Sequence, residues 1–192
     1  MKTSEIKLPN IVGAAGCARS GKDTLFALTC EVLSKNKECK IMRAGFADAV
    51  KQDLHQLLVK KVGISAFTED SKEKELIRGL MVEYGTNLMR KLDEDVWVNR
   101  MKLNVDLAKN INATLFITDV RYENEIDWIQ ENGGVVVYVE QEEKKPINKE
   151  EEKNDPMLRS KSDFLISWNH VGKEKLKKLK PKVRNLLKEI SC

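Results

Sequence analysis

The sequence predicts an α/β protein in which five parallel strands form a sheet flanked by helices. Two observations carry this prediction: short apolar runs alternate with segments of helical period along the chain, and a glycine-containing turn joins the first run to the first helix. With 192 residues, the chain is expected to be one domain, residues 1–192, large enough for a substantial core.

The first strand, Ile11 to Ala15, is followed by Gly16, Gly21 and Lys22 at GxxxxGK spacing. Successive backbone N–H groups of such a loop can wrap a β-phosphate, while the lysine ammonium reaches the β- and γ-oxygens. An apolar face then continues at helical spacing to Leu33. The pattern predicts a nucleoside triphosphate site, and the alternative is a plain glycine turn. Its residues are Gly16, Cys17, Ala18, Arg19, Ser20, Gly21, Lys22, Asp23 and Thr24.

Asp23 follows the loop lysine, where Ser or Thr is usual, and a hydroxyl comes one place later at Thr24. Thr24 can bind a phosphate oxygen, with Mg²⁺ held mostly through water and a carboxylate. This arrangement is compatible with small-molecule kinases and argues against a GTPase switch, in which the hydroxyl ligates Mg²⁺ directly. For Asp23, a carboxylate favoured by the helix dipole is the alternative.

A second strand, Cys39 to Phe46, leads into a helix that reaches about Lys61. Ligand residues of parallel α/β sheets lie at the carboxyl ends of strands, so Phe46, Asp48 and Lys51 are candidates to meet an acceptor. The alternatives are a core position for Phe46 and a helix N-cap for Asp48.

Two further helices are predicted before the third strand. The first begins near Ser71, bends near Gly85 and carries Arg90 on its last turn. The second spans Asp93–Asn110 and has Trp97 on its apolar side. Arg90 fits either a C-terminal helix charge or a guanidinium directed at a phosphate.

The third strand, Ala113 to Asp119, ends in a carboxylate, where Mg²⁺-bound water is commonly oriented. The following residues place Arg121 and Glu123 at the strand tip, and an arginine there could neutralise charge on a transferred phosphoryl group. A salt-bridged turn is the alternative. A short helix, Asn124 to Asn132, precedes a fourth strand, Val135 to Glu140.

Residues 141–161 have few apolar side chains, two prolines and dense mixed charge. By composition this is a solvated loop, and between two strands of a nucleotide-binding sheet we expect it to be a small lid. Lys145 and Arg159 are its candidates to close over phosphates. A fifth strand, Asp163 to Trp168, and a terminal helix opened by residues 169–172 complete the chain.

The net charge of +4 belongs to the last helix, because Lys173–Glu189 has eight basic and two acidic residues, +6, which leaves −2 elsewhere. Its apolar stripe favours a solvated outer face over stable nucleic-acid binding. The four cysteines lack metal-type spacing, and neither a signal peptide nor an apolar run that could span a membrane is present. We expect reduced thiols and a cytoplasmic protein.

Five blocks resemble, in order, those of the bacteriophage deoxynucleoside monophosphate kinases, which are phosphate-loop enzymes with an adenylate-kinase-like fold. The blocks are GCARSGKDTL, GFADAVKQDL, YGTNLMRKLDEDVWVNRM, FITDVRYENEI and SDFLISWNHVGKEKL. The paired GKDT and DVRYENE are the most specific. The resemblance implies transfer of the γ-phosphoryl group of ATP to a deoxynucleoside monophosphate, with Mg²⁺ and, in a viral setting, in the host cytoplasm.

The resemblance also implies residue roles. Gly16 to Thr24 would hold the ATP phosphates, with Lys22, Asp23 and Arg121 catalytic, and Thr24 and Asp119 would hold Mg²⁺ partly through water. Asn169 and Val171 would lie at the adenine. The acceptor side would be lined by Phe46, Asp48, Lys51, Arg90, Trp97, Arg121 and Glu123. The strand-to-lid junction, Glu140 to Lys145, has lysine as its only type of basic residue, where an arginine is expected in this family.

Three alternatives remain open: a kinase for another phosphorylated or hydroxylated metabolite, such as a coenzyme A precursor; a non-catalytic nucleotide-binding module; and nucleic-acid binding through the basic helix. Nucleotides are the expected partners. The accepted bases and the formation of a homodimer are left open by the sequence.

Overall fold

The computed structural model describes residues 6–34, 36, 38–142, 146, 149–169 and 173–191. The chain forms two compact units. The first comprises the chain up to Ala44 and from Leu103 onward, and the second comprises Gly45–Lys102. The phosphate loop and the sheet therefore belong to the first unit, whereas most of the residues predicted to meet the acceptor belong to the second.

The five predicted strands are present, each with ends within two residues of those expected: β1 (Ile11–Ala15), β2 (Lys40–Ala44), β3 (Ala113–Val120), β4 (Val135–Gln141) and β5 (Phe164–Trp168). They form one parallel sheet in the order β2-β3-β1-β4-β5. Because β1 lies between β3 and β4, the loop that follows it is placed at the centre of the carboxyl edge, where α/β sheets bind their ligands.

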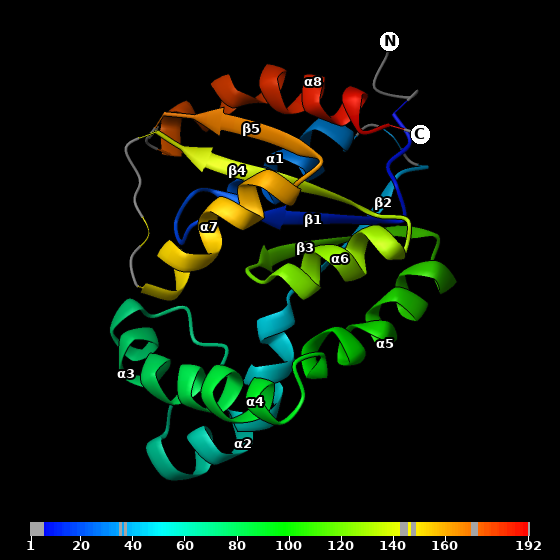
Figure 1. Cartoon of the computed structure of the whole chain (residues 1–192). Helices are drawn as coiled ribbons and strands as arrows, with labels where there is room; N and C mark the ends of the chain where they lie inside the picture. Colours follow the sequence, from blue (N-terminus) through cyan, green and yellow to red (C-terminus); the bar gives the residue numbers. More distant parts are fainter. Residues whose placement is uncertain are drawn as a thin grey trace. The chain divides into compact units, whose positions relative to one another are not determined.

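Helices cover both faces of this sheet (Figure 1). On one face, α1 (Lys22–Leu33) and α8 (Lys180–Glu189) pack on the strands, and on the other lie α6 (Glu123–Glu131) and α7 (Lys149–Lys161). A short 3₁₀ segment, Lys173–Leu179, precedes α8.

The α1 and α8 face holds the main core, because both helices present apolar residues at helical spacing to alternate positions of the strands. Leu25, Leu28 and Val32 of α1 are buried as predicted, and each such side chain contributes about 1.5–3 kcal/mol of hydrophobic stabilisation. On the other face, a Cβ on Gly13 of β1 would lie 2.6 Å from the Ile129 side chain of α6. Gly13 thus allows α6 to approach the strand closely.

The second unit is helical. It contains α2 (Phe46–Val62), α3 (Ser71–Val82), a π-helical segment, Glu83–Met89, and α4 (Arg90–Leu92). The last helix of the unit, α5 (Val96–Asn110), continues into the first unit.

The predicted bend near Gly85 is a π-helical segment with an identifiable cause. A Cβ on Gly85 would lie 3.2 Å from the Val50 side chain of α2, and the indole Nε1 of Trp97 donates to the Gly85 carbonyl at 3.1 Å. A side chain at this position and an uninterrupted α-helical hydrogen-bond pattern would both disturb these contacts.

The segment 141–161 differs from the prediction, because residues 149–161 form the helix α7 instead of a loop. The composition of these residues does not indicate a helix, because only Leu158 is buried on α7 and Pro156 lies inside it. Its function as a lid stays a prediction. Within the described ranges, no helix has the length and apolarity that crossing a membrane requires.

Candidate functional site

The loop after β1 has the backbone geometry that its glycines predict. Gly16 and Gly21 have φ of 126° and 102°, and Arg19, with φ of 61°, is also left-handed. Gly21 is the N-cap of α1, and no side chain in the described part of the chain caps the helix there. The first-turn amides of α1 are therefore available to an anion, as at other helix N-termini that bind phosphate.

Gly16 is required for a second reason. A Cβ on Gly16 would lie 2.4 Å from the backbone oxygen of Val139 in β4. By contrast, Gly133 has φ of 72° but nothing within 4 Å of the corresponding position. Gly16 thus combines backbone strain with a backbone clash, whereas Gly133 has only the strain.

We expect Gly16→Ala to lower the free energy of unfolding by more than about 3 kcal/mol, because Val139 is part of the central sheet and cannot move away cheaply. Gly133→Ala is the matched control and should cost only about 1–2 kcal/mol, the usual penalty for a left-handed residue with a Cβ. Urea unfolding of both variants measures the difference. Equal losses would contradict the close contact between Gly16 and Val139.

The Lys22 ammonium is folded into the loop. Its side chain is 7% exposed, and Nζ donates to the carbonyl oxygens of Gly16 and Cys17, each at 2.7 Å. Burial and the nearby Arg121 charge lower the pKa of Lys22 to about 8, although Glu151 and Asp119 oppose the shift. The loop therefore holds a cation whose charge is poorly solvated and which a bound anion would stabilise.

Trp168, the last residue of β5, supports the loop from the α1 side. Its indole Nε1 donates to the Ser20 carbonyl at 3.0 Å, and its ring would lie 2.8 Å from a Cβ on Gly21. The Ser20 hydroxyl is buried and has no hydrogen-bond partner among the described residues. A buried orphan hydroxyl within a glycine loop is consistent with a site that is completed by a ligand.

Arg121 follows β3, beside the loop. The buried Glu125 carboxylate accepts hydrogen bonds from the backbone N–H groups of Arg121, at 2.7 Å, and of Tyr122, at 3.2 Å. These bonds fix the turn that carries Arg121, whose guanidinium donates to Glu151 of α7 at 3.0 Å. The same guanidinium influences the pKa of Lys22. The structure thus brings Arg121 and the loop lysine together.

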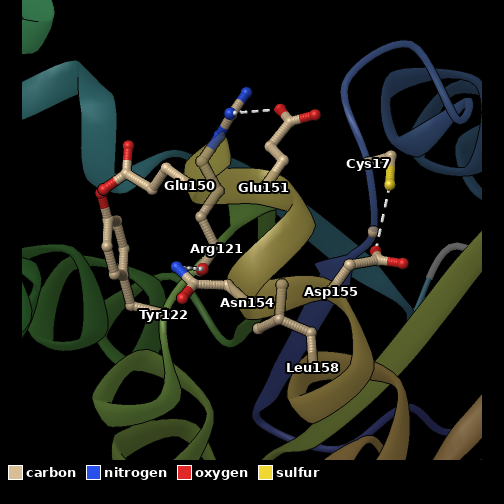
Figure 2. Close-up of a pocket in the computed structure, with 9 residues that line it drawn as sticks. Cys17, Arg121, Tyr122, Glu150, Glu151, Asn154, Asp155 and Leu158 are labelled. Atoms are coloured by element: carbon tan, nitrogen blue, oxygen red, sulfur yellow. Dashed lines mark hydrogen bonds and ion pairs between the residues drawn. The ribbon is translucent and has the colours of Figure 1, made fainter. Parts of the chain in front are cut away.

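One face of α7 lies against the phosphate loop (Figure 2). Glu151 accepts a hydrogen bond from the backbone N–H of Ala18 at 3.3 Å. One helical turn further, Asp155 accepts from the Cys17 thiol at 3.0 Å and from the Tyr138 hydroxyl at 2.6 Å. Burial and the Asp155 hydrogen bond raise the pKa of Cys17 to about 12 and also raise that of Tyr138, so both stay protonated donors at neutral pH. A pocket lies between these elements.

The residues predicted for the metal lie at this edge of the sheet. Asp119 is near the end of β3, and its charge acts on Lys22. Thr24 is half-buried in the first turn of α1, and Asp23 is exposed and paired with Arg43 at 3.4 Å. No three His, Cys, Asp or Glu side chains among the described residues form a cluster that could hold a metal ion. A carboxylate and a hydroxyl do fit Mg²⁺ when phosphate and water supply its other oxygens.

Two of the predicted acceptor residues, Phe46 and Trp97, are each only 3% exposed. A base could stack on either ring only after its neighbours moved, and this burial agrees with the core alternative for Phe46. Asp48 and Lys51 pair at 2.9 Å on α2, and Lys51 lies 5.7 Å from the centre of the Phe67 ring. The prediction that these residues bind an acceptor stays open.

Three of the remaining predicted residues have hydrogen-bond or ion-pair partners in the structure, and three others lie after β5 or outside the described residues. Arg90 donates to the Glu94 carbonyl at 3.3 Å, and Glu123 pairs with Lys161 at 3.0 Å. Arg159 pairs with Glu140 and lies over the Tyr138 ring. Asn169 is exposed after β5, whereas Lys145 and Val171 are outside the described residues.

Sequence reasoning did not identify the residues outside the loop that hydrogen-bond to it or to Arg121. Glu151, Asp155, Trp168 and Glu125 contact it or Arg121 from three different elements. Only Glu125 had a local signal, its place in an acidic first helical turn. The others are brought in by tertiary structure alone.

A glycine loop between β1 and α1, a buried loop lysine and an arginine after β3 define an α/β kinase of the phosphate-loop type. A family model described as deoxynucleotide monophosphate kinase matches residues 28–182. The chain belongs to this family, and with it to the nucleotide kinases. The match begins within α1, so the assignment of the phosphate loop rests on its own residues and geometry.

The chain is also similar to one viral protein in sequence and to one solved structure in fold. A protein of Acanthamoeba polyphaga mimivirus, provisionally named deoxynucleotide monophosphate kinase, is 24% identical over 147 residues, which cover 68% of this chain and 73% of the viral protein. This relative comes from a giant virus. The dephospho-CoA kinase of Campylobacter jejuni has a similar fold, with a TM-score of 0.51 and 14% identity over 95% of this chain and 97% of that chain.

Proposed function

We propose that the protein transfers the γ-phosphoryl group of ATP to a deoxynucleoside monophosphate and releases ADP and the deoxynucleoside diphosphate. The observation that carries the proposal is that two cations lie at one glycine loop: Lys22 is buried within it, and Arg121 pairs with Glu151, which also accepts from the Ala18 N–H of the loop. Two cations can stabilise the charge on a phosphoryl group during its transfer, and this reaction needs alignment and charge neutralisation more than a protein nucleophile.

In this proposal, the amides of Gly16 to Thr24 bind the ATP phosphates and Lys22 leaves the Gly16 and Cys17 carbonyls to reach the β- and γ-oxygens. Arg121 faces the transferred group from the opposite side of the pocket. Thr24 and Asp119 would hold Mg²⁺ partly through water, and the ion would neutralise charge on the β- and γ-phosphates. Lys51 and Arg90 are the residues proposed to bind the monophosphate.

The proposal includes exclusion of water, since ATP in an open site would be hydrolysed. The face of α7 that carries Asp155, together with Tyr138 of β4, forms a wall on one side of the phosphate loop. A cytoplasmic location, in the host when the chain is viral, supplies ATP and Mg²⁺.

The test is a coupled assay of ADP release with ATP, Mg²⁺ and each of the four common deoxynucleoside monophosphates, corrected for ATP hydrolysis. We expect turnover above hydrolysis with at least one of them. Absence of turnover with all four would reject the proposal. Dephospho-CoA belongs in the same screen, because turnover with it alone would support the other small-metabolite acceptor. Slow turnover with a large nucleotide-dependent change in partner affinity would indicate a binding module.

The pKa of Lys22 predicts how nucleotide affinity depends on pH. In the free protein this pKa is about 8, so about nine tenths of the lysine is protonated at pH 7. A bound nucleotide di- or triphosphate raises the pKa of Lys22, and binding above pH 8 must therefore take up a proton. The Lys22 contribution to affinity is fully present below pH 8 and is lost as the pH rises. Calorimetry of ADP binding between pH 7 and 9.5 should show this loss in the wild type and not in Lys22→Met.

A further inference from the structure

Glu151 presents a carboxylate where the proposed function requires a phosphate. One carboxylate oxygen accepts from the Ala18 N–H of the phosphate loop at 3.3 Å, and the other accepts from Arg121 Nη1 at 3.0 Å. The Glu151 side chain is only 10% exposed. Backbone amides and guanidinium groups both bind phosphate oxygens well.

The position of Glu151 is held by the rest of α7. Asp155, four residues later on the same helical face, accepts a hydrogen bond from Cys17 (Figure 2). It also accepts one from the Tyr138 hydroxyl. Tyr122, next to Arg121, donates to Glu150 at 2.5 Å, and Asn154 donates to the Arg121 carbonyl at 3.3 Å. These four hydrogen bonds fix the face of α7 that carries Glu151 against the phosphate loop and the Arg121 turn.

Building on the proposed function, we propose that Glu151 occupies an anion subsite formed by the Ala18 N–H and the Arg121 guanidinium, and competes there with a phosphoryl group of the nucleotide. A single N–H serves one acceptor well, so the Glu151 carboxylate and a phosphate oxygen exclude each other at Ala18. Their negative charges also repel. In the free protein the Glu151 carboxylate therefore occupies the anion subsite, and a binding nucleotide must displace this carboxylate.

The apparent affinity for the phosphate equals its intrinsic affinity multiplied by the fraction of free molecules in which Glu151 does not contact the loop. Contact in nine of ten free molecules corresponds to about a tenfold loss of affinity. Removing the Glu151 charge should recover this factor for any polyphosphate that enters the loop. The recovery does not depend on phosphoryl transfer, so it can be measured separately from turnover.

The experiment is calorimetric titration of the full chain with inorganic tripolyphosphate at constant ionic strength and without divalent metal. We expect Glu151→Gln to bind about five- to tenfold more tightly than the wild type. Glu152→Gln is the matched control, because it removes the same charge from the next, exposed position of α7 and should leave the affinity unchanged.

Glu151→Asp separates contact from charge. It keeps the negative charge but withdraws the carboxylate by one methylene, so competition by contact predicts tighter binding than in the wild type. Wild-type affinity in Glu151→Asp, or equal tightening in Glu151→Gln and Glu152→Gln, would show a general charge effect and overturn the proposal.

The remaining outcomes separate this inference from the proposed function. Unchanged or weaker binding by Glu151→Gln, with its unfolding midpoint preserved, overturns the inference alone. Failure of every variant to bind tripolyphosphate overturns it together with the phosphate-loop assignment. Tighter binding by Glu151→Gln supports it even if the deoxynucleotide assay shows no turnover.

Discussion

Lys22→Met is expected to lower turnover about 10²–10³-fold while the protein stays folded. This loss is the size found when one preorganised donor is removed from the site of developing charge. Methionine has a similar length and no charge, so it fills the buried space of the lysine stem without the ammonium. Steady-state rates with saturating ATP and acceptor measure the effect.

The second part of this prediction concerns the free energy of unfolding of Lys22→Met. The pKa of Lys22 falls from an ordinary 10.5 to about 8, which corresponds to about 3 kcal/mol by which folding disfavours the charged amine. The Lys22 hydrogen bonds to Gly16 and Cys17 offset part of this cost. We therefore expect Lys22→Met to unfold at pH 7 with a free energy equal to or above that of the wild type.

This pairing of lost turnover with retained stability is typical of a residue kept for function. Lys60→Met, at an exposed position of α2, is the control and should change neither quantity. A large loss of stability in Lys22→Met would contradict the prediction, because the loss of turnover would then reflect unfolding of the loop.

The parts of the site that sequence reasoning located are those set by the sheet itself. The alternation of strands and helices predicts a parallel sheet, and the carboxyl ends of neighbouring parallel strands share an edge. Residues that follow β1 and β3 must therefore lie close together. The influence of Arg121 and Asp119 on the pKa of Lys22 is the structural counterpart of that argument.

The helix α7 could not be predicted in this way, because its stability is not local. Its sequence has the composition of a loop, it buries only Leu158, and Pro156 interrupts its backbone hydrogen bonding. The side chains of Glu151 and Asp155 tie it to residues more than 100 positions away in sequence or on another strand. No periodicity within residues 149–161 encodes those partners.

For the aromatic residues, the sequence pattern is clear but fits two different roles. Phe46 ends a predicted apolar strand and Trp97 lies on the apolar side of a predicted helix, and each position fits both a base-stacking surface and a core position. Their burial and the hydrogen bond from Trp97 to Gly85 support the core role. Sequence alone cannot separate the two roles, because it does not reveal which side of an apolar residue is covered.

Arg121→Ala is expected to lower kcat about 10³-fold with little change in the KM of the acceptor. An arginine that contacts a transferred phosphoryl group stabilises charge that is largest in the transition state, and such arginines contribute factors of about 10³–10⁵. The turn that carries Arg121 is held by Glu125 through backbone N–H groups, so the variant should keep the local backbone.

Arg121→Lys separates charge from geometry. Lysine keeps the positive charge and loses the planar fork that binds two oxygens at once, so we expect a partial recovery of kcat, to about 1–10% of the wild type. Arg184→Ala, at an exposed position of α8, is the matched control and should leave kcat and KM unchanged. Unfolding midpoints of the three variants exclude a general loss of structure.

The two kinetic parameters distinguish two roles for the guanidinium. A fall in kcat and in kcat/KM by the same factor indicates an interaction that is made only in the transition state. A rise in acceptor KM at constant kcat would instead indicate that Arg121 binds the monophosphate in the ground state.

A double variant tests the link between Arg121 and Glu151, which pairs with the same guanidinium. We expect Arg121→Ala to cost less tripolyphosphate affinity when Glu151→Gln is already present than in the wild-type background. The reason is that the first substitution leaves a carboxylate without its counter-charge beside the loop, and the second removes that carboxylate.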